Sequence, residues 1–181
     1  MAEIRWGIIG CGNVTEVKSG PAFNKVADSK LVAVMRRDGA KAADYARRHG
    51  VPKWYSNADD LINDNEVNAI YIATPPDSHE AYTLAAIRAG KPVYVEKPMT
   101  LHAASAQVMM EAAQKADVKL SVAHYRRQQP YFKKIKELLK AKAIGDVLWI
   151  DLRFLQSHRA EMMGNDSNFW RVNPSISGGG I

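Results

Sequence analysis

The chain has little cysteine and no long hydrophobic run. Its single cysteine, Cys11, excludes an internal disulfide, and nothing in the sequence indicates an oxidising compartment. No apolar stretch reaches the roughly 18–20 residues that a membrane-spanning helix needs. The N-terminal Met-Ala-Glu-Ile also lacks the basic and then apolar plan of a signal peptide. We therefore expect a cytoplasmic protein with no membrane partner.

Several kinds of site are also missing. No histidine, cysteine or carboxylate cluster has the spacing of metal ligands, and no serine sits in a nucleophile-elbow sequence, so no metal is expected. The 25 basic and 19 acidic residues give a net charge of +6. The basic residues are scattered without aromatic alternation or zinc spacing, so a nucleic-acid partner is not expected. A moderately basic surface suits phosphate-bearing ligands and equally suits plain solubility.

The first two thirds of the chain alternate between short apolar runs and helical stretches. Such runs are typical of strands that are buried on both faces of a parallel sheet. The predicted strands are Arg5–Ile9, Leu31–Met35, Val51–Tyr55, Ala69–Ala73, Pro92–Val95 and Lys119–Ala123. Repeated strand-helix-strand units predict an α/β fold with a doubly wound parallel sheet of the Rossmann type over residues 1–123.

Helices are predicted between these strands from their caps and breakers. The predicted helices are Asp38–His49 ended by Gly50, a short helix capped by Ser56, Asp77–Ala89, and Leu101–Ala116 capped by Thr100. A helical region also follows the first strand, and we expect it to break at Pro21.

The pattern changes after residue 123. A basic amphipathic helix is predicted over Pro130–Ala141, and Val147–Gln156 alternates like a strand with one wet face, as in an antiparallel sheet. The polar stretch Gly164–Ile181 is predicted as a loop. Residues 124–181 therefore predict the beginning of an incomplete second α/β domain. Apolar surface should be uncovered around Val147–Gln156 because its sheet partners are missing.

A glycine turn follows the first predicted strand. Gly10 permits backbone angles that a side chain would forbid, and Gly12 leaves room for a pyrophosphate against the backbone. The next helix would offer free N–H groups, those of Asn13 and Val14, to an anion. Thr15 stands where the third glycine of the dinucleotide fingerprint is usual. Alone, this segment is compatible with dinucleotide binding or with a plain strand-turn-helix.

Polar sequences follow the other predicted strands, at the sheet edge where ligands bind. Arg36 and Arg37 stand where NAD-binding sites usually have an acidic residue, so they would attract the 2′-phosphate of NADP, unless Arg36 is a solvated loop charge. Asp38 is better placed as a helix cap than as a ribose partner. The remaining polar groups are in Thr74-Pro75-Pro76-Asp77-Ser78-His79, Glu96-Lys97-Pro98 and His124-Tyr125-Arg126-Arg127.

Lys97 is the strongest catalytic candidate. A cation beside a substrate hydroxyl stabilises the developing alkoxide as hydride leaves the carbon. The alternative is an exposed lysine at the end of a strand. Glu96 lines the cofactor's ribose or merely caps the sheet edge. His79 lies on the first turn of a predicted helix, where it has a capping or solvent role or a catalytic one.

Three segments carry a family resemblance: Gly7-Ile8-Ile9-Gly10-Cys11-Gly12, Ala73-Thr74-Pro75-Pro76-x-x-His79 and Val95-Glu96-Lys97-Pro98-Met99. With Ile144-Gly145-Asp146-Val147 and Trp170-Arg171 before Ser177-Gly178-Gly179-Gly180, the chain resembles the glucose–fructose oxidoreductase, inositol dehydrogenase and MocA (Gfo/Idh/MocA) family. The resemblance implies an NAD(P)-binding Rossmann domain and a C-terminal domain with an open antiparallel sheet, through which the complete protein would form a homo-oligomer.

The resemblance also implies an oxidoreductase acting on sugars, cyclitols or related alcohols. Lys97 matches the family's catalytic lysine, and Trp170 and Arg171 match a segment that folds back toward the cofactor in some members. Arg36 departs from the acidic residue of NAD-preferring members, which favours NADP with NAD as the alternative. The predicted cofactor-binding residues are Gly10, Gly12, Asn13, Val14, Arg36, Arg37, Thr74, Pro75, His79, Glu96, Lys97, Arg126, Trp170 and Arg171.

One departure concerns the acid/base. In the family the glycine triplet opens a motif that continues to an aspartate and a histidine, and neither follows before Ile181. We therefore expect a chain that binds cofactor and turns over poorly by itself. A non-catalytic NAD(P)-binding sensor or partner module remains the alternative.

Overall fold

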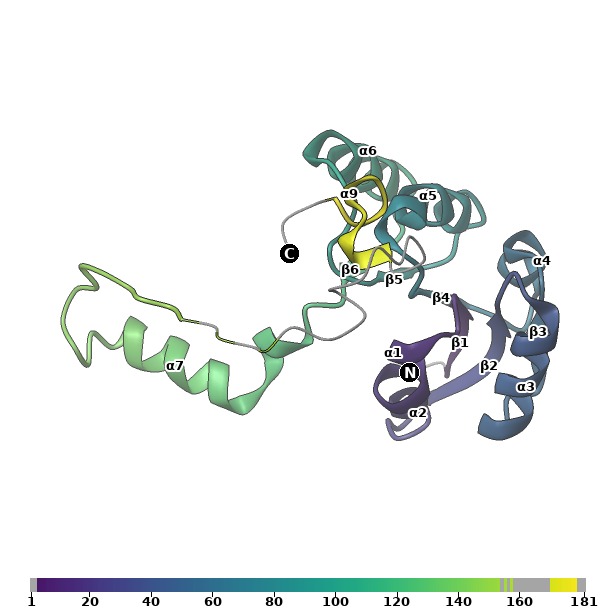
Figure 1. Ribbon diagram of the computed structural model, residues 1–181, viewed down its shortest axis with the longest axis horizontal. Helices are drawn as coiled ribbons and strands as arrows, with labels where there is room; N and C mark the ends of the chain where they lie inside the picture. Colours follow the sequence, from purple (N-terminus) through teal and green to yellow (C-terminus); the bar gives the residue numbers. More distant parts are fainter. Residues whose placement is uncertain (1–2, 154, 156, 158–169, 179–181) are drawn as a thin grey trace. The chain divides into compact units, whose positions relative to one another are not determined.

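The computed structural model describes residues 3–153, 155, 157 and 170–178 of the chain (Figure 1). The chain forms two compact units. The first contains the residues up to Ala123 together with the segment that begins at Trp170, and the second runs from His124 to Phe169. The division after Ala123 coincides with the predicted boundary, whereas Trp170 and the residues after it belong to the first unit.

Six parallel strands form one sheet in the first unit. The strands are β1 (Ile4–Ile9), β2 (Ser29–Met35), β3 (Lys53–Tyr55), β4 (Ala69–Ile72), β5 (Val93–Val95) and β6 (Leu120–Val122). Their order in the sheet is β3-β2-β1-β4-β5-β6, and every neighbouring pair is parallel. All six predicted strands are confirmed. The order reverses between β1 and β4, which is the point where open α/β sheets bind ligands.

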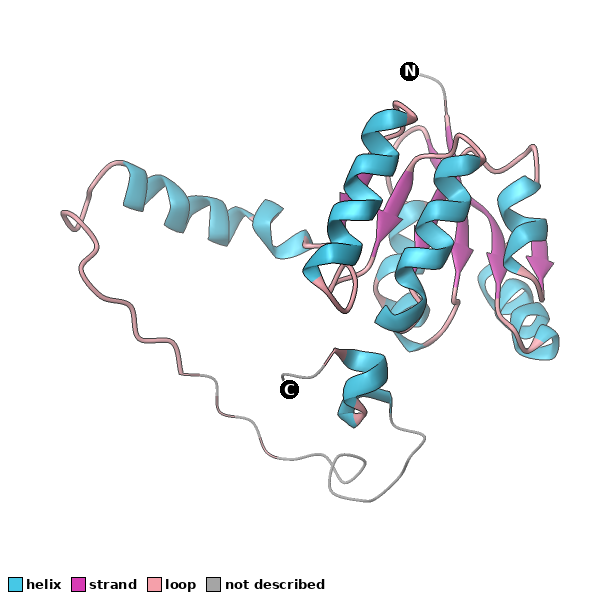
Figure 2. Ribbon diagram, turned by 90° about the horizontal axis from the view of Figure 1, so that it is seen from above, coloured by secondary structure: helices cyan, strands magenta, loops and turns pink. Residues whose placement is uncertain are grey.

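Helices lie on both faces of this sheet (Figure 2). They are α1 (Asn13–Val17), α2 (Ser19–Phe23), α3 (Gly39–His49), α4 (Ala58–Asn63), η1 (Pro76–Ser78), α5 (His79–Arg88) and α6 (Ala103–Lys115). One face buries Leu61, Ile87 and Met109 of α4, α5 and α6 against Ile9, Ile70 and Val95 of the sheet. The other face buries Tyr45 of α3 against Ile8, Val34 and Tyr71. Because successive side chains of a strand point to opposite faces of the sheet, neighbouring strand residues such as Ile8 and Ile9 pack against different helix layers.

Three predicted helix boundaries differ in the structure. Asn57, not Ser56, caps α4, because its side chain accepts a hydrogen bond from the Asp59 N–H at 2.9 Å. The N-cap of α6 is His102 rather than Thr100. The break expected at Pro21 lies earlier, at Lys18 between α1 and α2. Pro21 is tolerated within the first turn of α2, where a backbone N–H has no intrahelical acceptor.

The second unit contains η2 (Tyr125–Gln128) and α7 (Pro130–Lys140), which confirms the predicted helix. The predicted strand over Val147–Gln156 differs. Among its described residues, 147–153 and 155, none is in a strand. A strand needs a hydrogen-bonded neighbour, and no described segment pairs with this one. Its side chains are open to solvent, as expected: Leu148 is 94% exposed and Trp149 79% exposed.

The last described segment is helical rather than a loop. It contains η3 (Trp170–Val172) and α9 (Pro174–Ser177), and α9 packs against η1. Gly179 and Gly180 of the glycine triplet, together with residues 164–169, lie outside the described residues. In the part of the chain that the structure describes, no helix is long and apolar enough to cross a membrane.

Candidate active site

The glycine turn lies at the reversal point of the sheet. Gly10 has a φ of +92°, and a Cβ built there would lie 2.9 Å from the Thr74 backbone nitrogen and 3.0 Å from the Ala73 carbonyl carbon. The Gly10 and Cys11 N–H groups both donate to the Met35 carbonyl, at 2.9 and 3.1 Å. Gly10 is therefore required twice, for its left-handed backbone and for the close approach of the β1 and β4 ends.

Gly12 is a glycine for a different reason. Its backbone is extended, and the atom nearest to a Cβ built there is the Gly10 carbonyl oxygen, 3.9 Å away. The Gly12 carbonyl accepts from the Thr15 and Glu16 N–H groups, which starts α1. The N–H groups of Asn13 and Val14 precede these and have no intrahelical acceptor. The turn thus leaves bare backbone at Gly12 beside first-turn donors that lack an intrahelical acceptor, which fits a phosphate group.

The helix after the turn is held close to the sheet without the usual third glycine. Thr15 is fully buried, its hydroxyl donates to the Gly12 carbonyl at 2.8 Å, and its own carbonyl accepts from the Tyr45 hydroxyl at 2.8 Å. A Cβ at Gly20 would collide with the Thr15 carbonyl and the Tyr45 hydroxyl. The close approach therefore falls at Gly20, which the sequence pattern did not single out.

An ion-pair cluster ties the same helix to α3. The Glu16 carboxylate accepts two hydrogen bonds of 2.8 Å from the Arg48 guanidinium and lies 2.8 Å from Nε2 of His49. The hydrogen bonds from Arg48, aided by His49, lower the pKa of Glu16 to about 2. Glu16 is therefore ionised at neutral pH, and this cluster supports the turn from the side of α3.

The side chain of Arg36 reaches the glycine turn. Arg36 follows β2, is half-buried, and places its guanidinium Nη1 3.4 Å from the Cys11 carbonyl oxygen. Arg37 is exposed, and Asp38 caps α3 by accepting from the Lys41 N–H at 3.2 Å, as predicted. A cation thus stands beside the turn, where a dinucleotide places its adenosine ribose.

Cys11 is not a nucleophile in this setting. The residue is fully buried, and burial raises the pKa of its thiol to about 11 even though the Arg36 charge opposes the shift. A neutral thiol is a poor nucleophile, so Cys11 serves as a small residue within the turn.

The end of β4 forms a second wall of the site. Thr74 approaches Gly10, and its hydroxyl is 2.8 Å from the Ser78 hydroxyl, which also lies 2.9 Å from the Pro75 carbonyl oxygen. These contacts order the turn from Thr74 and Pro75 into η1. Both residues stand at the predicted edge of the sheet.

The structure places His79 differently from the expected cofactor contact. Its ring is fully buried, with Nε2 2.8 Å from the Thr74 carbonyl oxygen and Nδ1 3.0 Å from the Pro98 carbonyl oxygen. Both partners are acceptors, so a neutral imidazole donates to one of them and an imidazolium to both. His79 therefore connects the segments after β4 and β5 from inside the fold, because α5 turns its ring away from solvent.

Lys97 follows β5 at the same edge. It is exposed, and its ammonium forms no ion pair or hydrogen bond with any described residue. Its backbone N–H donates to the Glu96 carboxylate oxygen Oε2 at 3.1 Å, and its peptide bond to Pro98 is cis. The other Glu96 oxygen, Oε1, accepts from the Tyr71 hydroxyl at 2.6 Å. Sequence reasoning missed Tyr71; the available signal was a hydroxyl-bearing residue within the otherwise apolar strand β4.

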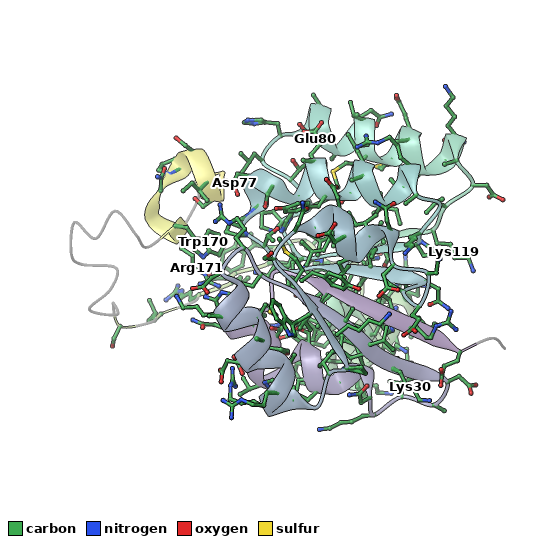
Figure 3. The ribbon with its side chains drawn as sticks, turned by 90° about the vertical axis from the view of Figure 1, so that its right-hand side faces the viewer. Lys30, Asp77, Glu80, Lys119, Trp170 and Arg171 are labelled. Carbon is green, nitrogen blue, oxygen red and sulfur yellow. The ribbon has the colours of Figure 1, made fainter. Side chains whose placement is uncertain are left out.

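Trp170 and Arg171 lie at the carboxyl edge of the strands. In Figure 3 they are close to Asp77 of η1, at the end of the sheet opposite to Lys30 and Lys119, which mark the amino ends of β2 and β6. The Arg171 guanidinium stacks 4.6 Å from the centroid of the Trp170 ring. The structure thus brings these two predicted residues to the expected edge. Arg126 belongs to the second unit, where it lines a cavity of about 430 Å³ with His124, Arg127, Phe132 and Lys136.

Comparison with known proteins decides the family. Residues 4–124 match the model of the oxidoreductase family with an NAD-binding Rossmann fold, GFO_IDH_MocA. The chain belongs to the Gfo/Idh/MocA oxidoreductase family. The resemblance stated from the sequence motifs is confirmed, and so is the Rossmann-type α/β fold.

Members of the Gfo/Idh/MocA family match this chain over part of their own length. Oxidoreductase P35 of Formosa agariphila is 51% identical over 179 residues, which cover 99% of this chain and 56% of that protein. A trans-1,2-dihydrobenzene-1,2-diol dehydrogenase of Xenopus tropicalis is 32% identical over 155 residues, which cover 83% of this chain and 46% of that protein. The chain therefore spans about half the length of these relatives.

A solved structure shows the same relation. A mutant 3-ketoreductase from Actinomadura kijaniata, in complex with NADP, superposes with a TM-score of 0.75 at 25% identity, covering 80% of this chain and 44% of that one. The Gfo/Idh/MocA assignment places the chain in an oxidoreductase family with an NAD-binding Rossmann fold.

Proposed function

We propose that this chain is the NADP-binding part of an oxidoreductase that transfers hydride between the nicotinamide and an alcohol or carbonyl carbon of a sugar, cyclitol or related compound. The observation that carries the proposal is the meeting of four features at one sheet edge. These are the bare backbone at Gly12, the Arg36 guanidinium beside the turn, the Thr74 wall and the exposed Lys97 ammonium.

The residues present fit a dinucleotide. The Gly12 backbone and the first-turn N–H groups would receive the pyrophosphate, because a Cβ built at Gly12 meets no side-chain atom of the described residues within 4 Å. Arg36 would pair with a 2′-phosphate, which favours NADP over NAD. When bound, the cofactor supplies a carbon that donates or accepts hydride.

Lys97 has the role of polarising the substrate oxygen. A positive charge beside that oxygen lowers the energy of the alkoxide-like state through which an alcohol and a carbonyl interconvert. Because its ammonium has no ion-pair partner among the described residues, Lys97 is available to a substrate. Trp170 and Arg171 would close the site from the side of η1, where Figure 3 places them.

The proposal is tested in two steps with this chain. NADPH is titrated first, and saturable binding is expected. A panel of polyols and ketoses with NADP or NADPH is then assayed in the wild type and in Lys97→Ala. The oxidoreductase proposal is supported if the wild type turns over a substrate and Lys97→Ala loses this turnover but still binds the cofactor. Cofactor binding without turnover, even after a separately expressed C-terminal half of Oxidoreductase P35 is added, would favour a non-catalytic module instead.

A further inference from the structure

The Tyr71 hydroxyl reaches from the core to the segment that carries Lys97. Tyr71 lies in β4 and is fully buried. The centroid of its ring is 5.3 Å from that of Phe23, in an edge contact, and 5.5 Å from that of Tyr94, whose ring is tilted relative to it. Its hydroxyl donates to Glu96 Oε1 at 2.6 Å. This distance lies at the short end of the usual range for O–H···O hydrogen bonds.

The Glu96 carboxylate links the Tyr71 hydroxyl to the backbone of Lys97. Oε1 accepts from Tyr71 and Oε2 accepts from the Lys97 N–H, so both oxygens are engaged by groups at fixed positions. The Glu96 N–H also donates to the Ile72 carbonyl at 2.9 Å, which attaches the residue to β4 through its backbone. The carboxylate therefore holds the Lys97 backbone in one orientation relative to the sheet.

The Tyr71 hydroxyl remains a donor. Burial, and then the hydrogen bond to Glu96, raise the pKa of Tyr71 far above its ordinary value, so the phenol stays protonated. The Ser19 hydroxyl lies 3.1 Å from the same phenol oxygen, and its own proton is directed to the Val14 carbonyl at 3.3 Å. Ser19 belongs to α2, so the glycine-turn helices and the Lys97 segment contact the same phenol oxygen.

Packing alone does not require this hydroxyl. Tyr94 is the register partner of Tyr71 on β5 and shares the same aromatic cluster. Its hydroxyl forms no hydrogen bond with any described residue. The two tyrosines therefore differ in what their hydroxyls do, although their rings fill neighbouring places in one core.

We propose that Tyr71 is a positioning residue that acts through Glu96 on Lys97 at the nicotinamide end of the cofactor site. The inference rests on the proposed function, because it assumes that the β5 end faces the nicotinamide. It predicts that loss of the Tyr71 hydroxyl disturbs this end more than the adenine end at Gly12 and Arg36, because the contact with Glu96, at 2.6 Å, is shorter than the contact with Ser19, at 3.1 Å.

The experiment compares Tyr71→Phe with the matched control Tyr94→Phe, each titrated with NADPH and with adenosine 2′,5′-bisphosphate, which represents the adenine half alone. Tyr71→Phe should weaken NADPH binding by about three- to tenfold, the usual net effect of losing one hydrogen bond. Its affinity for the bisphosphate should stay within about twofold of the wild type, and Tyr94→Phe should leave both affinities unchanged.

Equal losses for the two ligands, or no loss for NADPH, would overturn the proposal, since a general destabilisation does not distinguish the halves of the cofactor. A wild-type chain that binds neither ligand would overturn the proposed function and this inference with it. If the wild type binds the bisphosphate but Tyr71→Phe and the wild type bind NADPH equally tightly, this inference is wrong and the proposed function is unaffected.

A second variant protects the test against misfolding of Tyr71→Phe. Glu96→Gln changes a half-buried residue at the sheet edge and removes the carboxylate on which both contacts depend. The double variant should bind NADPH about as weakly as the weaker single variant, because the two residues act as one unit. Independent losses that multiply in the double variant would show that Tyr71 does not act through Glu96.

Discussion

The two glycines of the turn should fail in different ways when each is replaced by alanine. At Gly10 the φ of +92° is costly for any residue with a Cβ, by about 1–3 kcal/mol. The new Cβ would also press on the backbone of Ala73 and Thr74, at 3.0 and 2.9 Å. Overpacking of this kind adds about 1–3 kcal/mol. Gly10→Ala should therefore lower the free energy of unfolding by about 2–6 kcal/mol.

Gly12→Ala has the opposite profile. Its backbone is extended, which alanine adopts freely, and the nearest atom to the new Cβ is 3.9 Å away. The free energy of unfolding should change by no more than about 0.5 kcal/mol. The methyl group, however, would occupy the space in front of the bare backbone. Binding of NADPH should weaken at least tenfold, or about 1.4 kcal/mol.

The assay pairs urea denaturation with NADPH titration for both variants and the wild type. Gly12→Ala with an unchanged urea midpoint and much weaker binding is the expected result. If Gly12→Ala binds NADPH as tightly as the wild type, the turn does not receive the pyrophosphate and the site has been placed wrongly. A Gly10→Ala chain as stable as the wild type would show that the β1 and β4 ends do not approach as described.

Three further predictions concern charge and exposed surface. NADPH should bind more tightly than NADH, and Arg36→Asp should level or reverse this preference. If the ratio of the NADPH and NADH dissociation constants is the same in Arg36→Asp as in the wild type, Arg36 is only a solvated charge. The pKa of Glu16 is lowered to about 2 from its usual 4.5, so its contribution to stability is fully present above pH 4.5 and is lost as the pH falls toward 2. Glu16→Gln should flatten that part of the stability profile measured by urea denaturation, whereas a profile parallel to the wild type would contradict the role of the Arg48 pair. Finally, we propose that the exposed Leu148 and Trp149 mediate association between copies of the chain. Size-exclusion chromatography should then show oligomers, and Trp149→Lys should reduce their fraction. A wild-type chain that stays monomeric at high concentration would refute this proposal.

Residue types along the chain were sufficient to predict the sheet and its ligand-binding edge. Short apolar runs identify β1 to β6, and the Asp38 cap and Gly50 stop mark α3, because these signals depend on neighbours a few residues away. The same local signals failed at Ser56 and Thr100, because the N-cap positions are occupied by Asn57 and His102, one and two residues further along the chain. They also failed at Val147–Gln156, because alternation states which face is wet and not whether a partner strand is present.

The sequence by itself determined that a bare glycine turn, an arginine and a lysine follow three strands of one parallel sheet, since each of these facts is local. Only the tertiary structure decided that Gly20 rather than a third fingerprint glycine admits Tyr45, that the His79 ring turns inward between two carbonyls, and that Tyr71 reaches Glu96. Each of these contacts joins residues from different elements. Their distances are set by how the strands order and how closely the helices pack, which no short stretch of sequence specifies.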